Sequence, residues 1–175
     1  MRREPFWTLP NTVSLSRFVM AAGFLAARST DARIALIGAA SLSDVLDGWL
    51  ARWRGQVTRL GAMLDPISDR TFVLVAVMVY AARGEITRVD YFVLIARDLA
   101  TAIGFLVARL LPALRTVPFR ARLAGKLVTT LQLVTLVAVL LMPAAVPYLV
   151  GAVGVMSAVS IWDYTLALWR ARTAA

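Results

Sequence analysis

The chain contains neither cysteine nor histidine. Without cysteine it forms no disulfide and no thiolate metal site, and without histidine it lacks the usual acid/base group and zinc ligand. Acidic residues are also few, since 10 Asp and Glu stand against 19 Lys and Arg. Carboxylate oxygens are therefore the expected metal ligands, and they favour Mg²⁺ or Mn²⁺.

No low-complexity run, internal repeat or linker divides the 175 residues, so we expect a single domain over 1–175. A hydrophobic content of 60% and a mean hydropathy of +0.75 are too high for an ordinary soluble globule. Apolar stretches close to the roughly 20 residues that span a bilayer lie at 12–27, 32–51, 66–82, 89–111, 123–142 and 147–169. The sequence predicts an all-α polytopic protein with six transmembrane helices.

The net charge of +9 would suit a nucleic-acid partner, but the placement of the cations argues against one. For six helices with both termini in the cytosol, the cations follow the positive-inside rule. The inner ends and loops hold Arg2, Arg3, Arg17, Arg52, Arg54, Arg59, Arg109, Arg115, Arg120, Arg122, Lys126, Arg170 and Arg172. The outer ones hold Arg28, Arg33, Arg83 and Arg88. We expect a protein of the cytoplasmic membrane that binds membrane lipids and no nucleic acid.

The N-terminal region also allows another interpretation. Arg2 and Arg3 precede an apolar run that ends at Ala26 and Ala27, a pattern typical of a secretory signal peptide. Arg17 interrupts that run, so a first transmembrane helix is favoured.

One group of acidic and small residues recurs at helical spacing. It reads D-x-x-D-G-x-x-A-R, then G-x3-D-x3-D, and comprises Asp44, Asp47, Gly48, Ala51, Arg52, Gly61, Asp65 and Asp69. Offsets of three, four and seven put the first four on one helical stripe, and steps of four do the same for the last three. Two carboxylates at about 4 Å repel by roughly 4 kcal/mol at an effective dielectric of about 20. A divalent metal at the cytosolic ends of two helices is the expected counter-charge.

This group predicts phosphate chemistry, because carboxylate-bound hard cations are commonly completed by phosphates and water. Gly48 and Ala51 leave room for a nucleotide beside the helix backbone, Arg52 can grip phosphate through its planar fork, and Thr58 can add a hydroxyl contact. Each residue alone also fits a structural role, since small residues pack membrane helices and an Asp–Arg pair can be a neutral structural pair. Eight matched positions in one short chain favour the functional interpretation.

Asp44 to Asp69 resembles the complete signature of the CDP-alcohol phosphotransferase (CDP-alcohol phosphatidyltransferase) family, membrane enzymes that move a phosphatidyl group from a CDP-linked lipid to an alcohol. Pro10 and Asn11 with Arg17 resemble the family's entry into its first helix. The segment from Gly125 to Gln132 resembles the G-K-x-x-T segment of bacterial phosphatidylglycerophosphate synthases.

The resemblance implies six transmembrane helices, a homodimer, and a cytosol-facing cavity for CDP and two divalent ions, Mg²⁺ or Mn²⁺. It implies that the metal ligands are Asp44, Asp47, Asp65 and Asp69. Asp69 would also take the proton of the acceptor hydroxyl as general base. The residues implied to contact CDP are Gly48, Ala51, Arg52, Thr58 and Gly61. The attacked phosphorus would be the one that bears the lipid, with CMP leaving.

Arg97 and Lys126 are the expected binding residues for the acceptor's phosphate. A cation at mid-helix is costly in a membrane unless it faces a polar cavity or has a partner, and Asp98 or Asp163 is the alternative partner for Arg97. Within the family, glycerol 3-phosphate is the favoured acceptor, which implies phosphatidylglycerophosphate synthesis from CDP-diacylglycerol.

Two other acceptors and one other protein class stay open. The Arg97-Asp98 pair resembles the CDP-lipid-dependent cardiolipin synthases, whose acceptor is phosphatidylglycerol, whereas similar phosphatidylglycerophosphate synthases usually carry Arg-Glu. An inositol phosphate acceptor ranks third. A cation-binding transporter would need acids spread through the membrane depth, but here four gather at one end.

Overall fold

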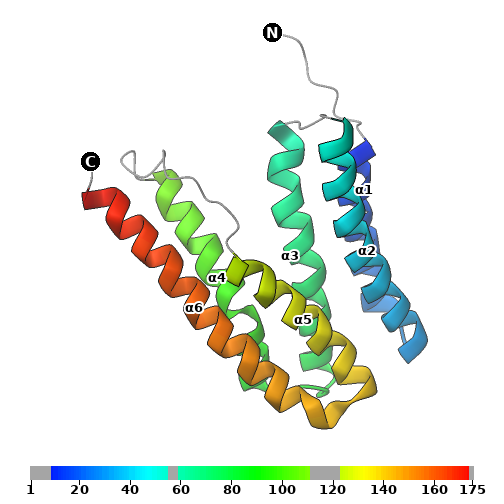
Figure 1. Cartoon of the computed structure of the whole chain (residues 1–175). Helices are drawn as coiled ribbons and strands as arrows, with labels where there is room; N and C mark the ends of the chain where they lie inside the picture. The colour runs from blue at the N-terminus through cyan, green and yellow to red at the C-terminus, as the bar shows by residue number, and fades with distance from the viewer. Residues whose placement is uncertain (1–8, 55–58, 111–122, 174–175) are drawn as a thin grey trace. The chain divides into compact units, whose positions relative to one another are not determined.

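The computed structural model describes residues 9–54, 59–110 and 123–173, which form helices joined by short turns (Figure 1). The elements are α1 (Leu9–Ala26), α2 (Thr30–Arg54), α3 (Arg59–Ala82), α4 (Arg88–Leu110), α5 (Leu123–Leu141), the 3₁₀ turn η2 (Pro143–Ala145) and α6 (Val146–Thr173). The prediction of an all-α chain with six helices is confirmed. Helix α3 begins seven residues before the apolar run at 66–82, because the signature residues continue the same helix.

The chain divides into two compact units, residues 1–85 and 86–175. In the first unit, α1 packs against both α2 and α3. In the second unit, α6 packs against both α4 and α5. Each unit is thus built around one central helix, and the single functional domain over 1–175 stays a prediction.

Aromatic side chains form the centre of the first unit. Phe24 on α1 is fully buried and contacts Phe72 and Tyr80 on α3, with ring centroids 5.8 and 5.7 Å apart in edge-to-face geometry. Phe72, Ala76 and Tyr80 recur every four residues, so they lie on one face of α3. This apolar stripe holds α1 against the half of α3 that follows the signature.

An ion pair between the buried Arg33 and the partly exposed Glu85 joins α2 to the turn after α3. Arg33 donates from Nη1 to both carboxylate oxygens of Glu85, at 2.8 and 3.0 Å, and its guanidinium lies 5.8 Å from the centroid of the Tyr80 ring. Gly84 makes this contact possible, because its φ of 71° is the left-handed conformation that ends α3 and reverses the chain. The N–H of the next residue, Glu85, donates to the Tyr80 carbonyl.

Side-chain caps mark the starts of two helices. The Ser29 hydroxyl accepts a hydrogen bond from the backbone N–H of Ala32 and so caps α2. Thr87 and Asp90 bond each other's backbone N–H groups at the start of α4, which is a capping box. The short turns that separate the predicted helices therefore have local causes in the sequence.

In the described part of the chain, one stretch is long and apolar enough to cross a membrane. It is Pro143–Asp163, with 21 residues. Shorter apolar stretches occur at Leu15–Ala26, Arg70–Ala82 and Gly125–Leu141. The six helices are thus present, whereas six membrane crossings belong to the proposal below.

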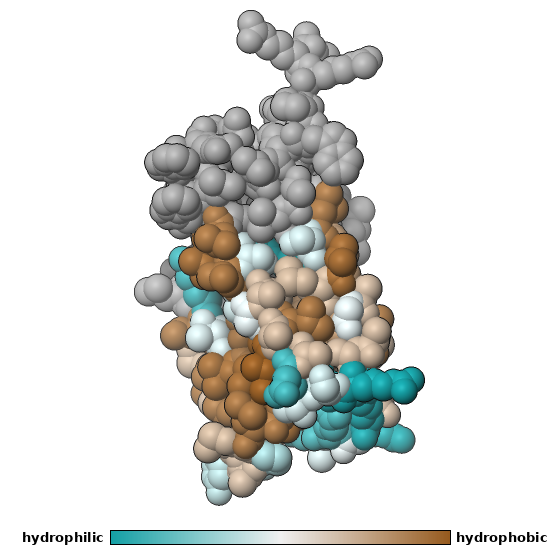
Figure 2. Space-filling model, turned by 90° about the vertical axis from the view of Figure 1, so that its right-hand side faces the viewer, coloured by the Kyte–Doolittle hydropathy of each residue, from teal (hydrophilic) through white to brown (hydrophobic). Residues whose placement is uncertain are grey.

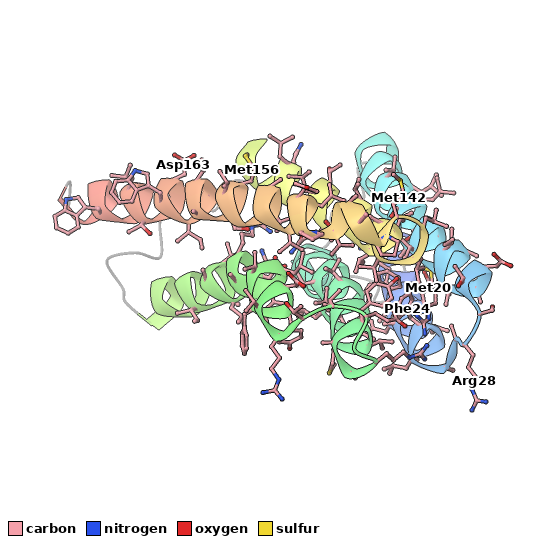
Figure 3. All side chains as sticks on the ribbon, turned by 90° about the horizontal axis from the view of Figure 1, so that it is seen from below. Met20, Phe24, Arg28, Met142, Met156 and Asp163 are labelled. Atoms are coloured by element: carbon pink, nitrogen blue, oxygen red, sulfur yellow. The ribbon has the colours of Figure 1, made fainter. Side chains whose placement is uncertain are left out.

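We predict that Glu85→Gln lowers the free energy of unfolding by about 1–3 kcal/mol, because it leaves the buried Arg33 guanidinium without its counter-charge. The measurement is the thermal unfolding of detergent-solubilised protein. Arg28→Ala is the control: Arg28 is exposed, and its side chain points away from the helices (Figure 3), so its change should stay within about 0.5 kcal/mol. Equal effects of the two changes would contradict a stabilising role for the ion pair.

Candidate functional site

The signature residues occupy consecutive stretches of α2 and α3. Asp44, Asp47, Gly48, Ala51 and Arg52 lie on α2, and α2 is helical without interruption from Thr30 to Arg54. The first four of these α2 positions therefore share the helical stripe that the sequence predicts. Gly61, Asp65 and Asp69 lie on α3.

The two stretches that carry the aspartates are close together in the sequence. Only residues 55–58 separate the last residue of α2 from the first of α3, and these include Thr58, which lies outside the described residues. A connection of this length spans at most about 17 Å. The end of α2 and the start of α3 therefore lie at the same end of the first unit (Figure 1), and α1 packs against both helices.

The donor set of these two stretches fits a hard divalent cation. Four aspartates supply only carboxylate oxygens, which are the ligands that Mg²⁺ and Mn²⁺ prefer. No group of three or more acidic side chains occurs in the part of the chain whose side chains are described, and the four aspartates lie outside that part. Their roles as metal ligands stay a prediction, as do those of the residues expected at CDP.

A buried cation on α1 lies beside the first signature residues. Arg17 is fully buried, and its Nε donates to the Ser43 hydroxyl at 3.0 Å, which in turn donates to the Ala40 carbonyl at 2.8 Å. Ser43 immediately precedes Asp44 and lies one helical turn from Asp47. The Arg17 guanidinium thus brings a positive charge to the stretch of α2 where negative positions gather.

A second polar cluster lies in the other unit, between α4 and α5. Arg97 Nη1 donates to Oδ1 of Asp98 at 3.1 Å, so the local ion pair with Asp98 is present. The other carboxylate oxygen of Asp98 accepts from Nε2 of Gln132 at 2.9 Å, and the same amide nitrogen donates to the Leu94 carbonyl at 2.6 Å. Arg97, Asp98 and Gln132 are all buried.

The Arg97 guanidinium lies against the backbone of α5 at Gly125. A Cβ atom on Gly125 would stand 2.5 Å from Nη2 of Arg97. This distance is too short, so the Arg97 side chain would have to move. The next residue, Lys126, is exposed. The two cations expected at the acceptor's phosphate therefore lie on helices that meet around Gly125, one buried and one open to the surroundings.

Gln132 and Ser43 were not assigned a role from the sequence. Both side chains are buried and hold an arginine, directly in the case of Ser43 and through Asp98 in the case of Gln132. A lone Gln in the apolar α5 was the available signal, because a buried amide needs hydrogen-bond partners.

A profile of the family described as CDP-alcohol phosphatidyltransferase matches residues 7–169, nearly the whole chain. The chain belongs to the CDP-alcohol phosphatidyltransferase family. The match extends over both compact units and includes the stretches of α2 and α3 that carry the signature. Family membership therefore favours an enzyme over a transporter.

Relatives with different names are about one third identical to the chain over the aligned residues. A probable phosphatidylglycerophosphate synthase of Mycobacterium tuberculosis is 33% identical over 159 residues, covering 86% of this chain and 73% of that protein. The CDP-diacylglycerol–glycerol-3-phosphate 3-phosphatidyltransferase of Aquifex aeolicus is 32% identical over 108 residues, 58% of this chain and 61% of the relative. The human cardiolipin synthase (CMP-forming) is 34% identical over 117 residues.

The matches leave parts of some relatives uncovered. The chain spans 61% of the length of the Aquifex protein and 38% of the human cardiolipin synthase. The relatives carry two kinds of name, so the acceptor is not decided by similarity.

We predict that Asp44→Asn and Asp65→Asn each weaken Mn²⁺ binding to the purified protein by about tenfold or more, because each removes one charged oxygen ligand from a site built only of carboxylates. Isothermal titration calorimetry measures the affinity. Asp31→Asn and Asp90→Asn, at exposed or half-buried positions at helix starts, are matched controls and should leave it unchanged. Equal loss in all four variants would reject the signature as the metal site.

Proposed function

We propose that this protein transfers the phosphatidyl group of CDP-diacylglycerol to glycerol 3-phosphate, giving phosphatidylglycerophosphate and CMP. The observation that carries the proposal is the complete signature, placed without interruption on two consecutive helices that a short connection joins. Residues typical of diphosphate and metal binding thus lie at one end of one helical unit. The M. tuberculosis relative, which covers most of the chain, supports the choice of reaction.

The reaction breaks a phosphoanhydride bond and forms a phosphate ester bond. The acceptor hydroxyl attacks the phosphorus that bears the lipid, the bond from that phosphorus to the oxygen of CMP breaks, and CMP leaves. Asp69 takes the hydroxyl proton, while Gly48, Ala51, Arg52, Thr58 and Gly61 hold the CDP moiety. Asp44, Asp47, Asp65 and Asp69 would hold two divalent ions, Mg²⁺ or Mn²⁺, which supply charge neutralisation at the diphosphate when bound.

Lipid contact accounts for the apolar surface of the helices. Val19, Leu42 and Val45 in the first unit and Val155 in the second are each more than half exposed. Figure 2 shows apolar side chains over much of the face that it draws, with hydrophilic ones gathered near its lower end. Six helices of this composition fit a protein of the cytoplasmic membrane whose active site faces the cytosol, in line with the distribution of arginines.

Assembly as a homodimer is part of the same proposal and follows from the family resemblance alone. Its partners are then CDP-diacylglycerol, the acceptor alcohol and the surrounding lipids.

The acceptor's phosphate is assigned to Arg97 and Lys126. Arg97 is held by Asp98 and lies beside Gly125, next to Lys126 in the chain. A cardiolipin synthase that uses phosphatidylglycerol is the second candidate, because position 98 carries Asp and several relatives bear that name. Both acceptors present a phosphate and a primary hydroxyl. An inositol phosphate acceptor ranks third.

The test is an acceptor screen on the purified full chain, with CDP-diacylglycerol and Mg²⁺ or Mn²⁺, in which CMP release is followed with each of the three acceptors. We expect the fastest release with glycerol 3-phosphate, and none after EDTA until metal is restored, since the carboxylate site has no other counter-charge of that strength. Preference for phosphatidylglycerol would select the second candidate. Full release in metal-free buffer would reject the two-metal assignment.

We predict that Asp69→Asn lowers kcat by about a hundredfold or more while CDP-diacylglycerol binding persists, because proton transfer by a positioned base typically contributes about 10² to 10⁴. Single-turnover CMP release and equilibrium binding of CDP-diacylglycerol separate the two effects. Asp31→Asn serves as the control and keeps both. Near-normal turnover by the Asp69 variant would remove Asp69 from the role of base.

A further inference from the structure

Arg97, the buried arginine of the second unit, is hydrogen-bonded to the described residues through one side of its guanidinium. Its Nη1 bonds Asp98, whereas its Nε is buried and has no hydrogen-bond partner among the described residues. The Arg97 residue as a whole is 7% exposed. An unpartnered buried N–H is unfavourable, so a group that accepts a hydrogen bond from it stabilises the site when it binds.

The unpaired Nε belongs to the edge of the guanidinium that suits a phosphate. Nε and Nη2 point their N–H groups to the same side of the planar group, and such an edge donates two parallel hydrogen bonds to two phosphate oxygens. Nη2 lies against Gly125, where the missing side chain leaves the space that this edge occupies. The site thus consists of two N–H donors on one edge of the Arg97 guanidinium, which lies against the backbone of Gly125.

The opposite side of the guanidinium is fixed through two further residues. The Gln132 amide bonds both the Leu94 carbonyl and Oδ2 of Asp98, which determines where the Asp98 carboxylate lies. Oδ1 of Asp98 then holds Nη1 of Arg97. Because the amide is anchored to the backbone of α4, the chain Gln132–Asp98–Arg97 has a defined geometry and includes one negative charge that offsets the buried cation.

We propose that Asp98 and Gln132 are positioning residues of the acceptor site: they hold Arg97 by Nη1, so that its Nε–Nη2 edge, accommodated by Gly125, receives the phosphate of the acceptor. The inference rests on the proposed function and refines it. The shared chemistry is a phosphate group, which glycerol 3-phosphate carries as a monoester and phosphatidylglycerol as a diester.

The experiment compares Asp98→Asn, Gln132→Leu and Gly125→Ala with the unaltered full chain in CMP release, with glycerol 3-phosphate and with phosphatidylglycerol. We expect each variant to raise the KM of the accepted acceptor by about tenfold and to leave the KM of CDP-diacylglycerol within about twofold. Asp98→Glu, which keeps a carboxylate, should recover most of the loss relative to Asp98→Asn. A general weakening of the fold would raise both KM values or lower kcat alone, and that result would overturn the inference.

Thr135→Val is the matched control. Thr135 lies on α5, is as deeply buried as Gln132, and its hydroxyl donates only to the Leu131 carbonyl of its own helix. Its change should leave both KM values within about twofold. If Thr135→Val raised the acceptor KM as much as Gln132→Leu does, the effect would be one of packing in α5 and the inference would fail.

Calorimetry without CDP-diacylglycerol measures the binding of glycerol 3-phosphate and of inorganic phosphate. It tests the positioning inference separately from the proposed function. Arg97→Ala and Lys126→Ala test the pocket itself. If they weaken phosphate binding and Asp98→Asn and Gln132→Leu do not, the positioning inference is overturned while the proposed function stands. If the unaltered chain releases no CMP with any acceptor, the proposed function fails, and a loss of phosphate binding in Asp98→Asn and Gln132→Leu still supports the positioning role.

Discussion

Three arginine side chains are buried between apolar helices, and the structure depends on how their charges are stabilised. Arg17, Arg33 and Arg97 are only 2%, 4% and 7% exposed. A buried charge costs several kcal/mol unless hydrogen bonds and a counter-charge offset that cost. Each guanidinium therefore constrains the elements around it, since its partner comes from another helix, from a turn or from the next residue along the chain.

The three arginines have different hydrogen-bond partners. Both carboxylate oxygens of Glu85 bond the Arg33 Nη1, which closes the end of the first unit away from the signature. Arg17 bonds Ser43, directly before Asp44, so its charge also acts on the stretch of α2 where acidic positions gather. Arg97 bonds Asp98, and its Nε has no hydrogen-bond partner among the described residues, which supports the proposed role in phosphate binding.

Hydropathy and turn residues were sufficient to predict the six helices, because apolar runs and residues such as Ser29 and Gly84 act locally. The signature could be recognised for the same reason, since its spacing follows one helix at a time. Gln132 and Ser43 could not be assigned, because a buried amide or hydroxyl acquires its role from a partner 34 or 26 residues away in the chain. Six membrane crossings also exceed what length and composition alone establish for the described helices.

In the proposed acceptor site, the geometry around Arg97 does not by itself select between the two candidate acceptors. In that site the Nε–Nη2 edge would bind two phosphate oxygens, and a monoester and a diester both supply them. An edge of this kind therefore gives affinity for phosphate without selecting between glycerol 3-phosphate and phosphatidylglycerol. Selection must come from the remainder of the acceptor, because a diester needs room for a second glycerol and its lipid chains, whereas a monoester carries more negative charge. Lys126, exposed beside Gly125, can balance that extra charge, so in the proposed site the preference between the two acceptors would depend on residues around the phosphate rather than on Arg97.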